Sequence, residues 1–186
     1  MRGEDEAWIT GVGIVSTVGE GAELTHQFLT EESRSGSAPA AATVLAPYPV
    51  HALCPVDFAK QIPSRAEQRQ MGAWQRIGTH AAGLALADAG AAGNSELLDA
   101  MDLNVAAGNG ERDTALDARV LEGFRASHDP GRFLNETLTS GLRPTLYLGE
   151  LSNLLAGNIQ IVHKVTGSSR TFKGEEMAGV SAVEDA

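Results

Sequence analysis

The sequence has little cysteine, few aromatic side chains and no excess of basic charge. Its single cysteine, Cys54, has no internal partner for a disulfide, which favours a reducing setting. The net charge of −10 disfavours nucleic acid and anionic membranes as partners. No apolar run is as long as about 18 residues, the length that a membrane-spanning helix needs. The opening residues "MRGEDEAW" lack the apolar core of a signal peptide. We therefore expect a cytoplasmic protein that binds neither nucleic acid nor a membrane.

The composition that remains indicates one well-packed core. Of the 186 residues, 42% are hydrophobic and only 5% aromatic, and the abundant alanine and glycine allow helices to pack closely on a sheet. Segment 31–47 is small and polar, and we interpret it as a surface loop. Strand-like and helix-like segments alternate, which predicts an α/β layered fold with a mixed, mostly parallel sheet flanked by helices. We expect strands at 7–16, 48–53, 101–108 and 167–172, and helices at 20–30, 65–89, 113–127, 144–164 and 176–186.

The strongest helix signal lies at 65–89. Small or apolar residues recur there every three or four positions, which predicts one narrow packing face. Basic residues stand at its start, namely Arg65, Arg69 and Arg76, with Lys60 just before them. In so acidic a chain they indicate either a contact for an acidic partner or a solvated helix face, and both interpretations stay open. The packing face consists of Met71, Trp74, Gly78, Ala81, Ala85 and Ala89.

Three features suggest chemistry, and each has a plainer explanation. The stretch "GVGIVS" gives G-x-G-x-x-S rather than the dinucleotide-binding G-x-G-x-x-G, so a strand-to-loop turn is the favoured reading. Cys54 follows no feature that would lower its pKa, which favours a buried or incidental thiol over a nucleophile. The histidines form no metal-ligand spacing, and we expect no metal and no cofactor. They are His26, His51, His80, His128 and His163.

Four segments together resemble one family. They are "WITGVGIVSTVGEG" (8–21), "SRAEQRQMGAWQRIGTHAAGLALADAG" (64–90), "LSNLLAGNIQIV" (151–162) and "GSSRTFKGEEMAGVSAVEDA" (167–186). In this order and spacing, the chain resembles the N-terminal half of a β-ketoacyl-acyl-carrier-protein synthase, a condensing enzyme of the thiolase-like fold. The resemblance implies that residues 1–186 form the N-terminal half of such a domain. It also implies that the two catalytic histidines of the family belong to a C-terminal half that this sequence does not contain.

The same resemblance places an acid where the family has its nucleophile. The family's elbow carries the pattern T-A-C-A-S-G between a strand and a helix. Setting the last glycine of the pattern on Gly179 puts the catalytic cysteine's position at Glu176. A cysteine at a helix N-terminus becomes a thiolate and accepts an acyl group, whereas a carboxylate there would give an unstable mixed anhydride. We therefore expect a non-condensing, chain-length-factor-like protein.

The resemblance also implies partners. Arg65 and Arg69 match two basic residues with which the family docks the acyl carrier protein. Ala66 and Gln70 stand where lysines are common, so we expect weakened docking, at a few tenths to about 1 kcal/mol for each lost charge. The strand "GSSRTF" implies a dimer edge, and hence a homodimer or a heterodimer with a condensing-enzyme subunit.

Three functional hypotheses follow. The first is a non-condensing subunit of fatty acid or polyketide assembly that pairs with an active synthase. The second is an acyl-thioester-processing synthase or acyltransferase that becomes active when the missing half completes it. The third is a non-functional fragment, whose exposed apolar faces would cause aggregation.

Overall fold

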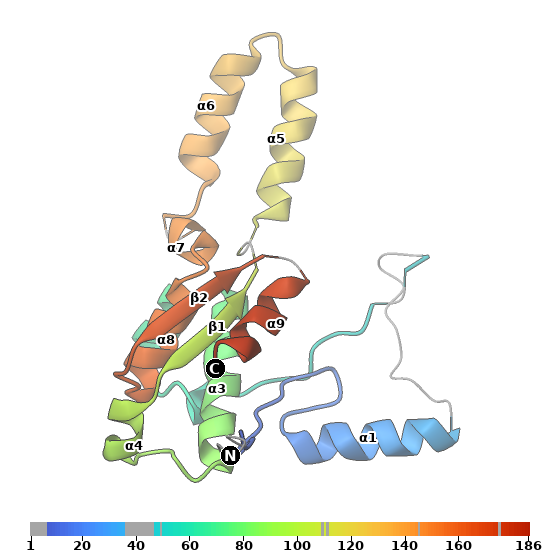
Figure 1. Ribbon diagram of the computed structural model, residues 1–186. Helices are drawn as coiled ribbons and strands as arrows, with labels where there is room; N and C mark the ends of the chain where they lie inside the picture. The colour runs from blue at the N-terminus through green and yellow to red at the C-terminus, as the bar shows by residue number, and fades with distance from the viewer. Residues whose placement is uncertain are drawn as a thin grey trace.

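A two-stranded parallel sheet forms the centre of the fold. The computed structural model describes residues 7–35, 47, 48, 50–108, 110, 112–144, 146–174 and 176–186. Strands β1 (Leu103–Ala107) and β2 (Ser169–Lys173) pair in parallel, with Leu103 opposite Ser169 and Ala107 opposite Lys173 (Figure 1). The predicted strands at 101–108 and 167–172 are therefore confirmed. Asp102 fixes the start of the pair, because its carboxylate accepts hydrogen bonds from the backbone N–H and the hydroxyl of Ser168 at 2.9 and 2.8 Å.

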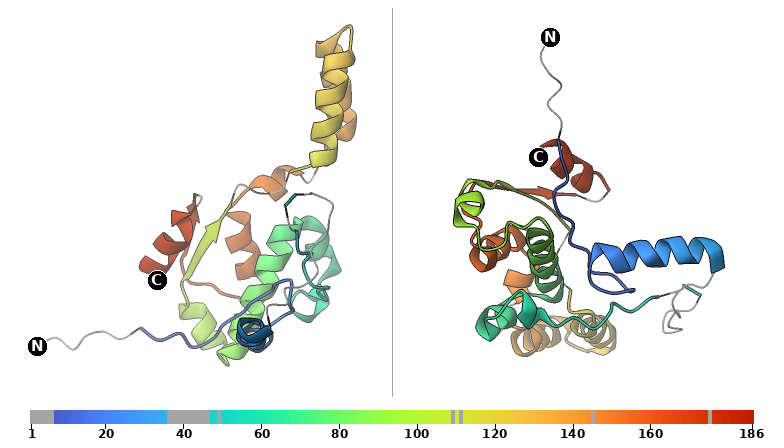
Figure 2. Two further views of the ribbon diagram at one scale, coloured as in Figure 1. Left: turned by 90° about the vertical axis from the view of Figure 1, so that its right-hand side faces the viewer. Right: turned by 90° about the horizontal axis from the view of Figure 1, so that it is seen from below.

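Helices cover both faces of this sheet. Helix α9 (Met177–Glu184) packs on one face and α8 (Leu154–His163) on the other, with α3 (Ala73–Asp88) packed against α8, as the successive layers in Figure 2 show. The core lies between β1 and α8, where each large buried aliphatic side chain contributes about 1.5–3 kcal/mol. Its buried members are Val105, Ala107, Leu155, Ala156 and Ile159. The predicted α/β layered architecture is confirmed.

The N-terminal segment departs from the prediction. Residues 7–14 are extended but belong to no strand, and Val15 makes only an isolated antiparallel bridge to Glu20. Trp8 is 79% exposed, so the expected buried strand at 7–16 is wrong. The physical reason lies in Gly11 and Gly13. A Cβ on either would come within 2.4 and 2.0 Å of backbone oxygens of α3, so these glycines let the segment lie directly on that helix.

The long helix predicted at 65–89 is interrupted. It consists of α2 (Arg65–Gln70) and α3, separated by extended backbone at Met71 and Gly72. The buried side chain of Gln75 accepts the Gly72 N–H at 2.9 Å and so caps the second helix. The small residues of α3 serve the predicted close packing: a Cβ on Gly78 would meet Leu155 of α8 at 2.8 Å.

Two antiparallel helices project from the body as an arm. Helix α5 (Thr114–Ala126) confirms the prediction at 113–127, whereas α6 (Pro130–Gly141) was not predicted. The arm lies beyond the end of the sheet in Figures 1 and 2, and its helices pack mainly on each other. Gly123 leaves room for the Phe133 ring between them.

The helix predicted at 144–164 is also two elements. Helix α7 (Leu146–Glu150) is separated from α8 by residues 151–153. Helix α3 holds α7 in place, because the Trp74 indole N–H donates to the Gly149 carbonyl at 2.9 Å and the Gln75 amide donates to the Leu148 carbonyl at 3.1 Å. One indole N–H and one side-chain amide thus fix the base of the arm.

The remaining elements are short or peripheral. Helix α1 (Ala22–Ser35) lies apart from the sheet in Figures 1 and 2 and takes in part of the predicted loop at 31–47, most of which falls outside the described residues. Residues 51–54 form no strand, so that prediction is wrong for the described part of 48–53. No helix in the described ranges is long and apolar enough to cross a membrane. The other elements are the 3-10 helix η2 (Phe58–Lys60) and α4 (Ser95–Ala100).

Candidate functional site

The corner after β2 holds the residue that the sequence singled out. Parallel strands end at the same edge of a sheet, and layered α/β folds bind ligands there. β1 ends at Ala107 and β2 at Lys173, so both lead into this edge. Glu176 follows as the N-cap residue of α9, and its side chain makes no capping hydrogen bond. The position of Glu176 is therefore a strand-to-helix corner, with an exposed carboxylate at the first turn of an eight-residue helix.

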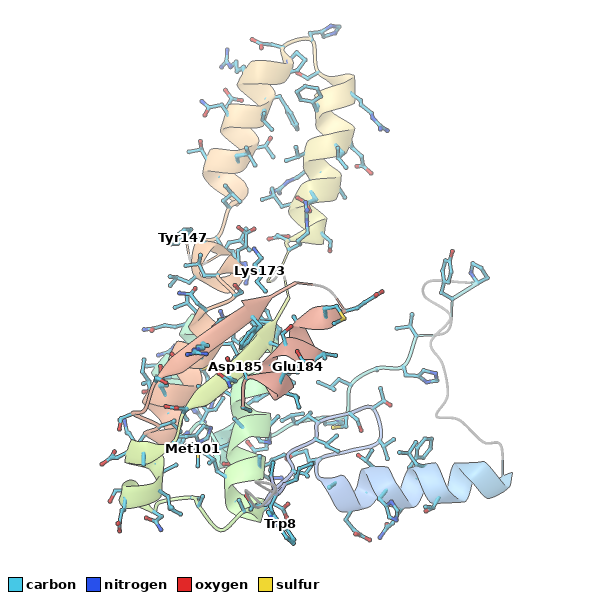
Figure 3. The ribbon with its side chains drawn as sticks, viewed as in Figure 1. Trp8, Met101, Tyr147, Lys173, Glu184 and Asp185 are labelled. Carbon is cyan, nitrogen blue, oxygen red and sulfur yellow. The ribbon has the colours of Figure 1, made fainter. Side chains whose placement is uncertain are left out.

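A cavity of about 550 Å³ lies beside this corner. That volume is within the usual range for small-molecule sites. The cavity lies between the base of the arm, α7 and Lys173 of β2, which is labelled at the arm end of the sheet in Figure 3. Arg112 lines it but is committed to Asp117 through a 2.8 Å ion pair. Lys173 is thus a cation on the cavity wall three positions before Glu176, although Glu176 itself does not line the cavity.

The two arginines predicted to dock a carrier lie on α2. Arg65 and Arg69 are exposed and one helical turn apart, so they share a face. Neither has an ion-pair partner in the part of the chain that the structure describes. Arg69 also lines a small crevice with Leu146, and Leu146 lines the larger cavity as well. The α2 face and the Glu176 corner are therefore on the same end of the sheet, separated by α7.

The other two basic residues have structural roles instead. Lys60 lies 3.8 Å from a Glu20 carboxylate oxygen. The guanidinium of Arg76 stands 5.4 Å from the centre of the Phe58 ring, a cation–π distance. Neither belongs to the α2 face, so the basic stretch seen in the sequence splits into the α2 pair and two residues that contact other elements, of which Lys60 stays exposed.

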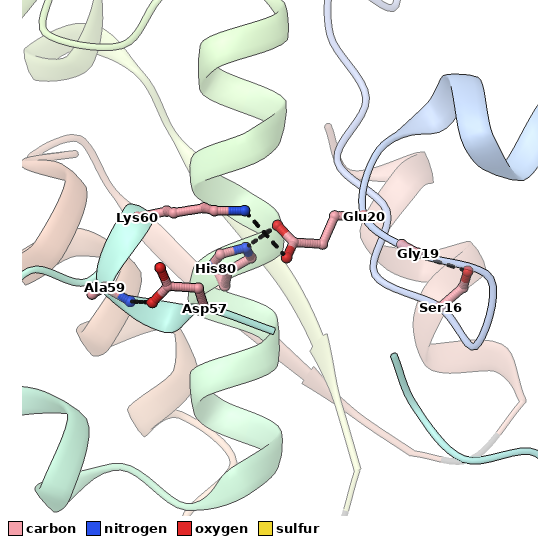
Figure 4. Close-up of polar contacts among 7 residues, drawn as sticks. All are labelled: Ser16, Gly19, Glu20, Asp57, Ala59, Lys60 and His80. Atoms are coloured by element: carbon pink, nitrogen blue, oxygen red, sulfur yellow. Dashed lines mark hydrogen bonds and ion pairs between the residues drawn. The ribbon is translucent and has the colours of Figure 1, made fainter. Parts of the chain in front are cut away.

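Sequence reasoning missed a buried histidine–glutamate pair. His80 is completely buried on α3, and its Nε2 lies 2.9 Å from Glu20 Oε2, with Lys60 on the other oxygen of Glu20 (Figure 4). The Phe58 ring packs edge-on against the imidazole. The cluster ties the turn at 16–21 to α3 and η2. No sequence signal could have found it, because Glu20 and His80 belong to separate segments that only the fold brings together.

His163 has a pKa below its ordinary value of 6.5, and burial is the main cause. The Thr79 carbonyl, 2.8 Å from Nε2, acts in the opposite direction, and the neighbouring His80 adds to the lowering. In the unfolded chain the His163 imidazole binds a proton with its ordinary pKa of 6.5, whereas in the folded chain it binds one only at a lower pH. Protonation of His163 therefore favours the unfolded state. We expect the free energy of unfolding to decrease as the pH falls from 7.5 to 5.5, measured by urea denaturation.

The variant His163→Gln keeps an N–H donor for the Thr79 carbonyl but does not titrate. It should lose part of this pH dependence, whereas His26→Gln on the exposed surface of α1 should keep it. Equal pH slopes for the native protein and His163→Gln would contradict the assignment.

The weaker sequence candidates are placed as follows. Gly11 and Gly13 allow the close contact with α3. The strand-to-loop turn that the sequence analysis favoured for these glycines is therefore wrong. Cys54 is half-buried in an irregular segment, where its backbone N–H donates to the Ser16 carbonyl at 3.2 Å. Within the described residues no three His, Cys, Asp or Glu side chains gather as a metal site would require.

The layered arrangement is similar to part of two solved structures. One similar structure is a β-ketoacyl synthase from Burkholderia phymatum STM815, with a TM-score of 0.59 and 20% identity over 96% of this chain and 41% of that one. Another is the ishigamide ketosynthase/chain length factor, with a TM-score of 0.56 and 20% identity over 88% of this chain and 38% of that one. This chain therefore spans about two fifths of their length, and the thiolase-like fold expected from the sequence is confirmed. No family model and no curated protein matches the sequence.

Proposed function

We propose that the chain is a non-condensing relative of the β-ketoacyl synthases that acts beside a cysteine-bearing synthase in fatty acid or polyketide assembly. The observation that carries the proposal is Glu176 at the strand-to-helix corner. The Glu176 carboxylate stands at a helix N-terminus, an environment that favours an anion over a neutral group. Attack on a thioester would give an anhydride of higher energy than the thioester itself, and no acyl-enzyme would accumulate.

A partner chain is supported by the outer surface of α9. Met177, Val180 and Val183 lie on one side of this helix and are 65%, 47% and 78% exposed. They recur at three-residue spacing, so they form a continuous apolar strip on the side away from the sheet. Such a strip next to the Glu176 corner fits contact with further protein, either a synthase subunit or the rest of a synthase domain.

A carrier protein would meet the α2 face. An acyl carrier protein is acidic, and this chain has a net charge of −10, so long-range forces oppose their encounter. Arg65 and Arg69 are the exposed cations that would offset this repulsion locally. Two exposed charges contribute about 0.4–2 kcal/mol together, which corresponds to weak docking.

The proposal is tested by incubating the chain, a cysteine-bearing synthase of the same cell and acyl-loaded carrier. We expect a stable complex by size-exclusion chromatography, and intact-mass spectra with the acyl group on the synthase and none on this chain. The variant Glu176→Gln should leave product formation by the complex within about twofold, as should Glu184→Gln at the other end of α9.

Results of two kinds would contradict the proposal. One is failure to associate with any synthase of that cell. The other is an acyl adduct on this chain, or a tenfold loss of product with Glu176→Gln but not with Glu184→Gln, which would instead favour an acyl-thioester-processing enzyme.

A further inference from the structure

A second cavity lies at the opposite end of the sheet from Glu176. It has a volume of about 330 Å³ and is enclosed by α3, by α4, which leads into β1, and by the end of α8, which leads into β2. It therefore lies at the amino-terminal ends of the strands. Figure 3 shows this separation, because Met101 beside α4 and Lys173 beside the arm mark the two ends of the sheet.

The inner part of this cavity is apolar with one nitrogen acceptor. Leu98 and Gly83 are buried, and Leu86 and Val162 are half-buried. His163 also lines this part. Its Nε2 faces the Thr79 carbonyl, which can only accept, so Nε2 carries the proton of the neutral ring. Burial lowers the pKa of His163 and keeps the ring neutral at physiological pH.

The other ring nitrogen is available to a ligand. Nδ1 of the neutral ring is a lone-pair acceptor, and it makes no hydrogen bond within the described part of the chain. Gly83 makes this arrangement possible, because a Cβ there would lie 2.6 Å from His163 Cε1 and 2.3 Å from Gln61 Oε1.

The rim of the cavity carries one charge of each sign. Asp99 and Lys164 are both exposed and both line the opening. One Asp99 oxygen accepts the Thr166 hydroxyl at 2.8 Å, which orients the carboxylate and leaves its second oxygen available. Lys164 has φ +62°, and it is the only described non-glycine residue in the left-handed region. A lysine at a position that favours glycine is consistent with a role for its side chain that offsets the backbone strain.

We propose that this cavity binds a small amino acid whose aromatic ring carries a hydroxyl or N–H donor, as in tyrosine or tryptophan. The ring would occupy the apolar interior and donate its hydrogen bond to Nδ1 of His163. The carboxylate would pair with Lys164 at the rim, and the ammonium with Asp99. Nδ1 of His163, Lys164 and Asp99, three of the polar groups that line the cavity, then each meet a complementary group of one ligand.

The test is titration of the full chain with L-tyrosine, monitored by backbone amide NMR shifts, with three matched compounds. L-phenylalanine lacks the hydroxyl, tyramine lacks the carboxylate and 3-(4-hydroxyphenyl)propanoate lacks the ammonium. We expect saturable shifts around α4 and the end of α8, with tyrosine binding at least tenfold more tightly than each of the three. No saturable shifts, shifts elsewhere, or equal binding of tyrosine and phenylalanine would overturn the proposal.

Two variants separate binding from folding. Lys164→Gly relieves the left-handed backbone and should raise the melting temperature by about 2–4 °C, while weakening tyrosine binding at least fivefold. Gly83→Ala should push Gln61 and His163 into the cavity and abolish binding. Because Lys164→Gly is expected to be more stable than the native chain, unchanged tyrosine affinity in that variant would overturn the assignment of Lys164 even if Gly83→Ala fails to fold.

Discussion

Gly13→Ala is expected to lower the free energy of unfolding by about 3 kcal/mol. The new methyl group would lie 2.0 Å from the Ala81 carbonyl oxygen and 2.6 Å from the Ala85 backbone nitrogen. Both atoms belong to the α3 backbone and cannot rotate away, so the N-terminal segment must leave the helix. Overpacking of this kind costs about 1–3 kcal/mol and sometimes more. Urea denaturation followed by circular dichroism measures the change.

The same substitution at Gly157 is the matched control. Gly157 lies within α8, and nothing stands within 4 Å of the Cβ it would gain. Gly157→Ala should therefore raise the free energy of unfolding by about 0.5–1 kcal/mol, because alanine favours a helix over glycine. If Gly13→Ala were as stable as the native protein, residues 11–13 would not lie on α3 in solution.

Gln75→Leu is expected to cost about 2–4 kcal/mol of unfolding free energy. Leucine fills a similar space but leaves the Gly72 N–H without its partner, and it leaves the Leu148 carbonyl with only the Leu151 N–H at 3.4 Å. Each buried polar group that loses its hydrogen bond costs about 1–3 kcal/mol. The helix start at Ala73 and the base of the arm should both loosen, which hydrogen exchange at the Trp74 indole measures together with urea denaturation.

Gln27→Leu provides the comparison on the surface. Gln27 lies on α1 and its amide only meets the Glu23 carboxylate at 2.7 Å. Its replacement should change the free energy of unfolding by no more than about 0.5 kcal/mol. Equal stability of the Gln75→Leu and Gln27→Leu proteins would contradict the bridging role of Gln75.

Local sequence patterns predicted the helices and strands whose conformation is determined by the residues within them. Strand β1 and helix α5 follow from apolar runs and periodicity, and the corner at Glu176 follows from the resemblance to condensing enzymes. Helix α6 was predictable as well, because Asp129 is a capping residue and Pro130 stands at the first helical position.

Other features depend on contacts between distant segments. The break at Gly72 is set by the side chain of Gln75 and by its bond to α7, which periodicity cannot indicate. The apolar run at 7–16 has the composition of a strand, yet its glycines place it on a helix. The Glu20–His80 pair and the cavity around His163 likewise arise only when the helices assemble.

The parallel pairing of β1 and β2 also constrains the order of folding. Leu103 and Ser169 are separated along the chain by a long segment that contains α5, α6, α7 and α8, and their pairing closes this segment into a loop. Closing so long a loop carries an entropic cost that slows non-local pairing. The arm, whose two helices are neighbours along the chain, has no such delay. We therefore expect the arm to form early and independently, and the sheet to close last.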